Sequence, residues 1–166
     1  MKARGFSLVE MVLVIAAVSI LTAIGTMNFN AYAKRYKTEA QTRLLYSELL
    51  RARVNAVHQG RPIRIKLYRA RFEVYSSERD NADGVSPLQT HTLDYPITST
   101  ASEGNATQGY PLQFEPNGLA KVLGSICLEQ SAGSGAVDSI KIAFTRVSIG
   151  KKDRGEECNA DNITIK

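Results

Sequence analysis

The sequence has no tryptophan, two cysteines, two histidines and five prolines in 166 residues. Two cysteines are too few for a disulfide-dense miniprotein or for most structural zinc sites, and two histidines leave little for a catalytic metal centre. Twelve glycines and five prolines exclude a collagen-like or linker composition. With 43% hydrophobic and 22% charged residues, the chain is not intrinsically disordered. The length fits one ordinary domain, and the formal charge of +5 permits anionic partners without requiring them.

Sequence motifs that carry catalysis are missing as well. The chain contains no G-x-x-x-x-G-K-[ST], G-x-S-x-G, H-E-x-x-H or C-x-x-C pattern. His58 falls near a predicted helix end and His91 in a predicted strand, where surface or capping roles are expected. Residues 80–84 lack the alternating ligands and distal Glu of a calcium loop and predict a plain turn. We therefore expect a protein that is not an enzyme and that has no cofactor and no metal.

Apolar residues are concentrated at the start of the chain. Residues 6–27 read FSLVEMVLVIAAVSILTAIGTM, in which Glu10 is the only charged residue. As a helix this run is about 33 Å long, enough to cross a hydrocarbon core of about 30 Å. A carboxylate in such a span costs about 2.5–3.5 kcal/mol at its centre and less near its edge, so it is usually functional and paired. A cleavable secretory signal is not expected, because the small residue Gly5 precedes the apolar run.

The first ten residues resemble the class III signal of type IV prepilins and pseudopilins. The matching residues are Lys2-Ala3-Arg4-Gly5 followed by Phe6-Ser7-Leu8-Val9-Glu10. The resemblance implies that a prepilin peptidase cuts the chain after Gly5 and methylates the new amine of Phe6. It also implies that Glu10 pairs with this amine in a neighbouring subunit and so serves subunit assembly.

The predicted helix continues past the apolar run. Residues 28–59 contain no Pro or Gly, and Leu45, Leu49, Ala52 and Ala56 recur at helical spacing. Gly60, with Pro62 behind it, predicts the helix stop. We divide the chain into a leader over 1–5, a transmembrane half of the helix over 6–27, an amphipathic half over 28–60 and a β-rich globular body over 61–166.

Short β segments follow the helix. Alternating apolar residues in 62–77 predict a hairpin, and Pro116-Asn117-Gly118 predicts a turn. Polar, small residues predict loops over 98–108 and 131–135. Further strands are predicted over 88–95, 110–115, 119–129 with Gly124 as a bulge, 138–149 and 162–166. The expected fold class is α+β, a long N-terminal helix packed on an antiparallel β-sheet.

Three further stretches resemble the H-type minor pseudopilins and the FimT- and FimU-type minor pilins. They read ARVNAV at 52–57, FEPNG at 114–118 and RVSIG at 146–150. The resemblance implies the type IV pilin fold and a structural subunit that primes or caps assembly of a type IV pilus or a type II secretion pseudopilus. The implied partners are prepilin peptidase, other major and minor pilins or pseudopilins, the inner-membrane assembly platform and membrane lipid.

The implied location is the bacterial inner membrane, crossed once, with a periplasmic body that later enters the filament. This orientation rests on the resemblance, because three cations just beyond the apolar run weaken the positive-inside signal of the leader: Lys34, Arg35 and Lys37. Two alternatives stay open, a major pilin and a FimT-like DNA-binding minor pilin used in DNA uptake. The sequence also does not decide between a type IV pilus and a type II secretion system.

The two cysteines, Cys127 and Cys158, both fall in the predicted body. A periplasmic body lies in an oxidising compartment, where paired thiols persist as disulfides. A bond between them would close a loop of about 32 residues and stabilise the fold by roughly 3–4 kcal/mol in the chain-entropy model. Two separate buried thiols are the alternative.

Four cations near the C-terminus are candidates for DNA contact: Arg146, Lys151, Lys152 and Arg154. We expect them near the end of a strand and in the loop after it, where long cations can follow a phosphate backbone. Carboxylates at 153, 156 and 157 interleave with them, and residues 151–166 contain no aromatic side chain to stack on single-stranded bases. A structural role in the filament is therefore favoured over DNA binding.

Overall fold

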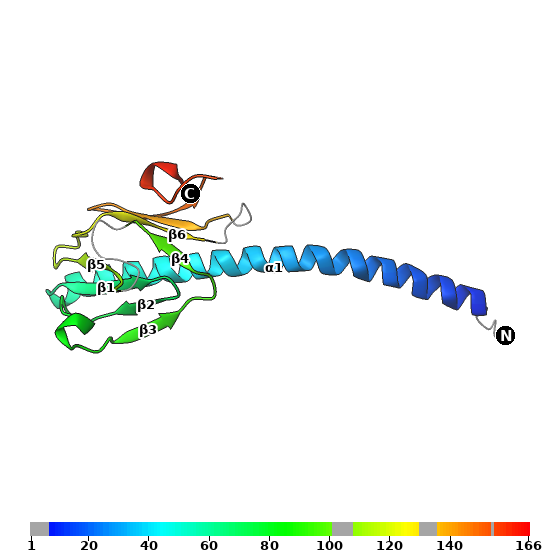
Figure 1. The fold of residues 1–166 in the computed structure, drawn as a ribbon, viewed down its shortest axis with the longest axis horizontal. Coiled ribbons are helices and arrows are strands. Elements are labelled where there is room, and N and C mark those ends of the chain that lie inside the picture. The colour runs from blue at the N-terminus through cyan, green and yellow to red at the C-terminus, as the bar shows by residue number, and fades with distance from the viewer. Residues whose placement is uncertain (1–6, 101–107, 130–135, 154) are drawn as a thin grey trace.

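The computed structural model describes residues 7–100, 108–129, 136–153 and 155–166, without the side chains of 24–28 and 31. Within these residues one long helix, α1, enters a body in which the strands form two antiparallel sheets (Figure 1). The predicted α+β class is confirmed. The single sheet that we expected is wrong, because the strands divide into one group of four and one group of five.

Helix α1 spans Leu8–Gln59, 52 residues and about 78 Å of helix. It ends at Gly60, whose positive φ of 63° is the left-handed conformation that glycine adopts most easily, and whose N–H donates to the Val57 carbonyl. The predicted stop is therefore confirmed. The residue that precedes the helix, Ser7, is extended, and its side chain makes no capping hydrogen bond.

The four-stranded sheet has the order β3-β2-β1-β5. The hairpin predicted over 62–77 is confirmed as β1 and β2, with Leu67 opposite Phe72. On its other side β1 pairs with β5, which places Ile65 opposite Leu112. The strand bounds are Ile63–Tyr68 for β1, Arg71–Val74 for β2, Gln89–Thr92 for β3 and Tyr110–Phe114 for β5.

The five-stranded sheet has the order β4-β6-β7-β8-β9. Its bounds are Ile97–Ser99 for β4, Gly124–Leu128 for β6, Ser139–Ile142 for β7, Val147–Lys152 for β8 and Ile163–Ile165 for β9. Because directly opposed residues share a face, Ile126 and Ile140 lie on one face, and Cys127 and Ser139 lie on the other. The short helices are η1, Asn81–Asp83, and η2, Ala160–Asn162.

Three predicted strand boundaries are wrong. The strand expected over 119–129 begins only at Gly124, because residues 115–120 form a turn in which the Glu115 N–H donates to the Leu119 carbonyl. The strand expected over 138–149 is a hairpin, since the Ala143 N–H donates to the Arg146 carbonyl and reverses the chain between β7 and β8. Strand β4 occupies the first residues of the loop expected over 98–108.

The second half of α1 carries the core of the body. Leu45, Leu49, Ala52 and Ala56 are buried, as their spacing predicted, and both sheets contact this part of the helix. The inner faces of the sheets complete one hydrophobic cluster with side chains such as Ile65, Leu67, Phe72, Ile126, Ile140 and Val147. Burial of these apolar side chains, not helix propensity, holds α1 to the sheets.

The first half of α1 lies outside this core. Residues 8–37, here called the rod, extend away from the sheets (Figure 1). Apolar side chains of the rod such as Leu8, Leu13 and Leu21 are 65–79% exposed. Among the described residues no helical stretch reaches the length and apolarity of a membrane span. The membrane span predicted over 6–27 includes residues whose side chains are not described, so the span stays a prediction.

Candidate functional site

Glu10 lies in the first turn of α1, where the partial positive charge of the helix N-terminus favours a carboxylate. Its side chain is exposed among exposed apolar neighbours such as Val9 and Met11. No ion pair to Glu10 is formed within the described part of the chain. The other two residues of the predicted processing and assembly site, Gly5 and Phe6, lie outside the described residues.

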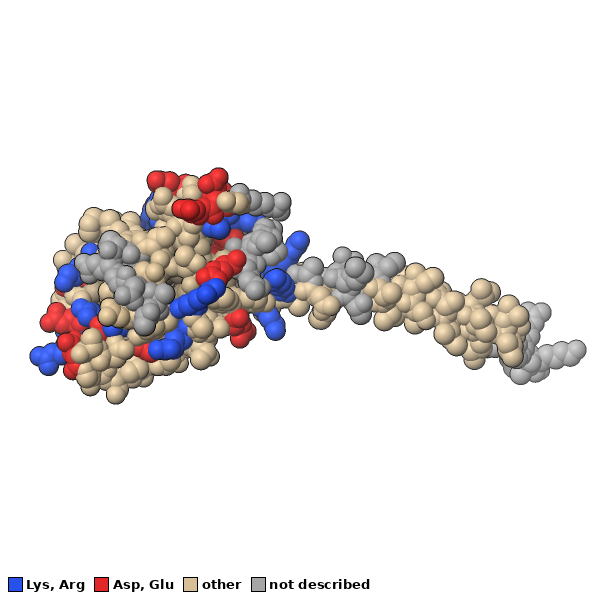
Figure 2. All heavy atoms as spheres, in the orientation of Figure 1, with Lys and Arg blue, Asp and Glu red and all other residues tan. Residues whose placement is uncertain are grey.

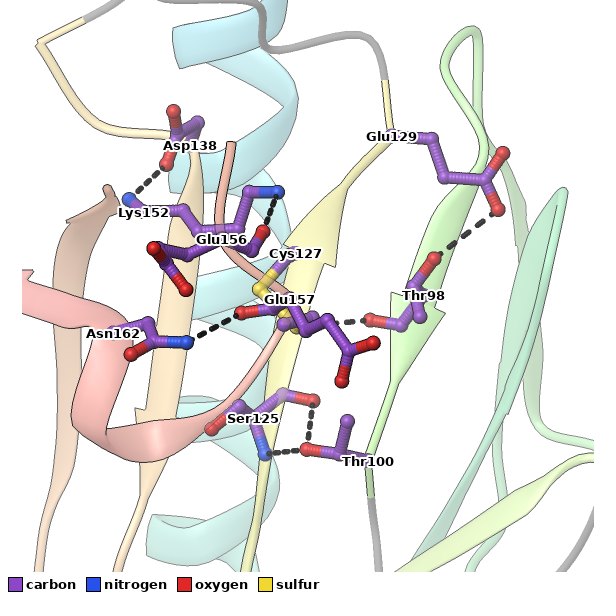
Figure 3. The surroundings of a disulfide bond; sticks show 11 residues. Thr98, Thr100, Ser125, Cys127, Glu129, Asp138, Lys152, Glu156, Glu157 and Asn162 are labelled. Carbon is purple, nitrogen blue, oxygen red and sulfur yellow. Dashed lines mark hydrogen bonds between the residues drawn. A yellow bond between two sulfur atoms is a disulfide. The ribbon is translucent and has the colours of Figure 1, made fainter. Parts of the chain in front are cut away.

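The disulfide expected between Cys127 and Cys158 is present in the body. Cys127 is buried in β6, while Cys158 comes from residues 155–162, here called the C-terminal segment, which precede β9. The bond fastens this segment beside β4 and β6, as Figure 3 shows. The alternative of two separate thiols is therefore excluded by the structure.

Hydrogen bonds reinforce this attachment of the C-terminal segment. The Lys152 ammonium donates to the Glu156 carbonyl at 2.7 Å, and the Lys141 ammonium donates to the Ala160 carbonyl at 2.9 Å. The buried carboxylate of Asp138 accepts from the Lys152 backbone N–H at 2.7 Å (Figure 3). The ammonium groups of these two lysines thus donate hydrogen bonds to backbone carbonyls, which leaves them less free to bind an anion.

The four cations considered for DNA contact are not brought together in one loop. Arg146 is exposed in the turn before β8, whereas Lys151 and Lys152 are half-buried at the far end of that strand, about 17 Å away along an extended chain. Our expectation of a loop for these two lysines is wrong, because β9 pairs with them and continues the ladder. Arg154 lies outside the described residues. DNA contact stays a prediction to which this arrangement adds no support.

A buried ionic cluster on β1 is a feature that sequence reasoning missed. Asp80 accepts from the Arg64 guanidinium at 2.8 Å and from the Lys66 ammonium at 2.9 Å. Burial by itself would raise the pKa of the Asp80 carboxyl, but hydrogen bonds from Arg64, from the Ala82 N–H and from Lys66 lower the pKa below its usual value. The cluster binds the turn at 80–84 to the outer face of the sheet, which is a structural role.

The spacing of two acids could have pointed to this turn. Asp80 caps η1 by accepting from the Ala82 N–H, while the Asp83 carboxylate accepts from the Asp80 N–H at 3.2 Å. An acid followed three residues later by another acid is typical of such reciprocal capping. The plain turn predicted there is confirmed. Its anchoring by Lys66 had no sequence signal, because a lysine in a strand usually faces water.

A second buried pair joins β2 to the residue that follows it. The Tyr75 hydroxyl donates to Glu73 at 2.6 Å, and Arg71 donates to the same carboxylate at 2.9 Å. Burial and this hydrogen bond raise the pKa of the Tyr75 phenol, whereas the pKa of Glu73 is lowered because its hydrogen bonds to Tyr75 and Arg71 outweigh its burial.

Two of the cavities open on the described part of the body. One of about 480 Å³ opens beside the disulfide and is lined by Ser125, Lys141 and Glu157 among others. Another of about 260 Å³ lies between the two sheets, beside Tyr68, Ile97 and Tyr110. Within the described ranges, no three His, Cys, Asp or Glu side chains are grouped to hold a metal ion.

The stretches at 52–57 and 114–118 meet near the C-terminal end of α1. The predicted turn at 116–118 is confirmed, with a hydrogen bond of 2.8 Å from the Gly118 N–H to the Glu115 carbonyl. Gly118 has a φ of 77°, and a Cβ there would lie only 3.1 Å from Val57. The N–H of Ala120 donates to the carbonyl of Phe144, which links this turn to the β7–β8 turn just before the stretch at 146–150.

Comparisons with known proteins bear on both parts of the molecule. Residues 1–26 match a family model described as the prokaryotic N-terminal methylation motif. The fold is similar to that of the type IV minor pilin FimU of Pseudomonas aeruginosa strain PAO1, with a TM-score of 0.52 and 18% identity over 71% of this chain and 91% of FimU. A second crystal form of FimU gives a TM-score of 0.47 at 18% identity, over 67% of this chain and 90% of FimU. No curated protein matches the sequence.

The two findings concern different segments of the chain. The family model covers residues 1–26, while the likeness to FimU, at 18% identity, shows the fold. One helix, α1, runs through both segments. Its exposed first half begins within the matched residues 1–26, and its second half contributes to the core of the body. The chain therefore joins a match to the prokaryotic N-terminal methylation motif, over residues 1–26, to an α+β fold similar to that of the type IV minor pilin FimU.

Proposed function

We propose that the chain is a minor pilin or minor pseudopilin, a structural subunit that primes or caps assembly of a type IV pilus or a type II secretion pseudopilus. The observation that carries the proposal is one continuous 52-residue helix that begins within the methylation motif and ends in a FimU-like body. Its first half presents apolar side chains that no part of the described chain covers. Such a surface fits the membrane first and the helices of neighbouring subunits afterwards.

The first step in this function is processing of the leader. A prepilin peptidase cuts between Gly5 and Phe6 and methylates the Phe6 amine, which removes the cations Lys2 and Arg4. Mass spectrometry of the native protein should find an N-terminal, methylated Phe6. An intact Met1 in cells that contain an active peptidase would contradict the proposal.

The second step is docking of the processed helix against a neighbour. The new amine of one subunit is positive, and Glu10 of the next subunit offers an exposed carboxylate without an ion pair in the described residues. In apolar surroundings an unpaired charge is costly, so pairing the two groups favours a fixed register between subunits. Glu10 therefore acts in assembly and contributes little to folding of the body.

Substitution of Glu10 tests this step. Glu10→Ala should leave membrane insertion and the melting temperature of the body unchanged, and reduce the amount of the chain in sheared filaments by more than about tenfold. Glu39→Gln is the matched control, because it removes another helix carboxylate whose exposed pair with Arg43 contributes little. Normal incorporation of Glu10→Ala would contradict the role of Glu10, and an equal loss in both variants would show a general effect of charge.

The minor role, as opposed to that of a major pilin, rests on the body. Its fold is similar to FimU, which is a minor pilin. A subunit that primes or caps a filament is needed in a few copies, whereas a major pilin repeats along its length. Quantitative mass spectrometry of sheared filaments should therefore find this chain far below the most abundant subunit, and deletion of it should reduce the number of filaments. A chain that forms the bulk of the filament would be a major pilin.

The proposed location follows from the same arrangement. The apolar run 6–27 anchors the chain in the inner membrane, the body lies in the periplasm, and the assembly platform extracts the subunit into the filament. The disulfide supports a periplasmic body, because disulfides persist in oxidising compartments. Protease added to spheroplasts should digest the body and leave a membrane-embedded fragment near the N-terminus. Full protection of the body would place it on the cytoplasmic side.

A further inference from the structure

The junction between the rod and the body carries a concentration of positive charge. Lys34, Arg35 and Lys37 are all exposed on the last turns of the rod, directly before Thr38, which is buried. No acidic residue occurs in the sequence between Glu10 and Glu39, and Glu39, one turn beyond Arg35, forms its ion pair with Arg43 at 2.8 Å. Figure 2 shows cationic side chains gathered at the place where α1 leaves the body.

Three aromatic side chains occupy the same stretch of helix. Phe29, Tyr32 and Tyr36 are each 67–68% exposed, and their spacing of three and four residues places them on one face. Tyr36 and the buried Leu45 are nine residues apart, which is two and a half turns of helix. The aromatic face therefore points away from the sheets, and the body does not cover it.

Aromatic rings beside cations at the end of an apolar run match the chemistry of a membrane surface. Tyrosine is enriched where hydrocarbon meets headgroups, because its ring is apolar and its hydroxyl is polar. Lysine and arginine near an anionic surface each strengthen binding by about fivefold. An acidic protein surface would also attract the cations, but it gives no reason for a stripe of aromatics that continues the apolar run.

The spacing along α1 agrees with this surface. Lys34 lies about 10 Å along the axis beyond residue 27, where the apolar run ends. The headgroup layer is about 5–8 Å thick on each side of the hydrocarbon core. Because helical side chains tilt toward the helix N-terminus, Lys34, Arg35 and Lys37 lean toward that layer. Long cationic side chains at this height can therefore reach phosphate groups while Phe29 and Tyr32 remain nearer the hydrocarbon.

We propose that an interfacial collar binds the headgroups of anionic phospholipids and fixes how deeply α1 sits in a bilayer before the chain enters a filament. The collar consists of Phe29, Tyr32, Lys34, Arg35, Tyr36 and Lys37. The proposal rests on the membrane anchor of the proposed function. The positive-inside rule predicts few cations on the non-cytoplasmic side of a membrane span. The proposal explains why three cations nevertheless follow the apolar run on that side. The collar holds the precursor at a defined depth, and extraction into the filament must break its contacts with lipid.

The absence of tryptophan from the sequence permits a direct experiment on the full chain. Tyr36→Trp places a single fluorophore in the collar. The variant is reconstituted into vesicles that contain brominated phosphatidylcholine or brominated phosphatidylglycerol, and quenching measures which lipid is next to the ring. We expect phosphatidylglycerol to be favoured about fivefold over phosphatidylcholine at low salt, and the preference to fall at 0.5 M salt because ions screen the contact.

Two further variants in the Tyr36→Trp background separate local charge from net charge. Replacing Lys34, Arg35 and Lys37 together by Gln should abolish the preference for phosphatidylglycerol while quenching by both lipids persists. The matched control replaces three exposed cations of the body by Gln and should retain the preference: Arg61, Arg79 and Lys121. Each triple variant lowers the charge by the same amount, so only the position of the cations differs.

The outcomes distinguish the collar from the anchor. Equal quenching by the two lipids at low salt, with the collar intact, would overturn the proposal. The cations would then be better explained by contact with an acidic protein surface. Loss of the preference in the control variant as well would also overturn it, because net charge would then explain the result. No quenching by either lipid would instead contradict the membrane anchor of the proposed function.

Discussion

The two halves of α1 share one backbone and meet opposite surroundings. In the rod, Leu13 is 65% exposed, whereas Leu49 in the second half is 0% exposed and belongs to the core cluster. Both halves are rich in apolar side chains, but only the second has sheets packed against it. The difference shows that apolar surface in this chain serves two purposes. The apolar side chains of the second half form the core of the body, whereas those of the rod stay exposed in the described chain.

A pair of matched substitutions is the strongest test of this comparison. Leu49→Ala should lower the free energy of unfolding of the body by about 3–5 kcal/mol, because it removes core contacts and leaves a cavity. Leu13→Ala, the same chemical change in the rod, should leave it unchanged. Thermal unfolding of the full chain in detergent, followed by near-UV circular dichroism, measures both. A comparable loss in Leu13→Ala would mean that the rod contributes to the fold of the body.

The disulfide provides the next largest expected effect. Replacing Cys127 and Cys158 together by Ser should destabilise the body by about 3–4 kcal/mol, since a loop with a sequence separation of 31 is then open in the unfolded chain. Limited proteolysis should cut residues 155–162 sooner in the variant, while cleavage in the rod stays unchanged. If the C-terminal segment keeps its protection, the hydrogen bonds of Lys141 and Lys152 hold it without the disulfide.

Acid should affect the body through Asp80. Its folded pKa lies below the unfolded value of about 3.9, so the stabilisation that it provides is complete above that value and is lost as the pH falls through the folded pKa. Asp80→Asn should cost about 3 kcal/mol at pH 6, because Arg64 and Lys66 lose their carboxylate. The gap between the wild-type chain and the variant should shrink below about pH 4 in urea titrations. A gap that is independent of pH would show that the loss comes from packing alone.

The smallest effect is expected where the two halves of α1 meet. Arg43→Ala breaks an exposed pair with Glu39 one helical turn away, with 2.8 Å between nitrogen and oxygen. Such pairs contribute about 0.3–0.5 kcal/mol, and salt screens them. The melting temperature should therefore change by no more than about 2 °C, and not at all in 0.5 M salt. A larger change would mean that the Arg43 side chain packs against the body in addition to pairing with Glu39.

Local patterns in the sequence anticipated the parts of the fold that depend on near neighbours. The helix stop at Gly60, the hairpin of β1 and β2, and the turn at 116–118 each follow from residues within a few positions. The strands expected over 119–129 and 138–149 came out wrong for the opposite reason. Their boundaries depend on hydrogen bonds such as that from the Ala120 N–H to the Phe144 carbonyl, whose partners lie 24 positions apart.

The candidate site divides in the same way. The sequence alone indicated the leader, Glu10, the long helix with an apolar first half and the cysteine pair, because each is a matter of composition and order along the chain. Only the tertiary structure decided that the strands form two sheets, that Lys151 and Lys152 lie in a strand beside β9, and that Asp80 joins Arg64 and Lys66. Those outcomes depend on which segments meet in space, and that is set by burial of the shared core over the whole chain and not by any local pattern.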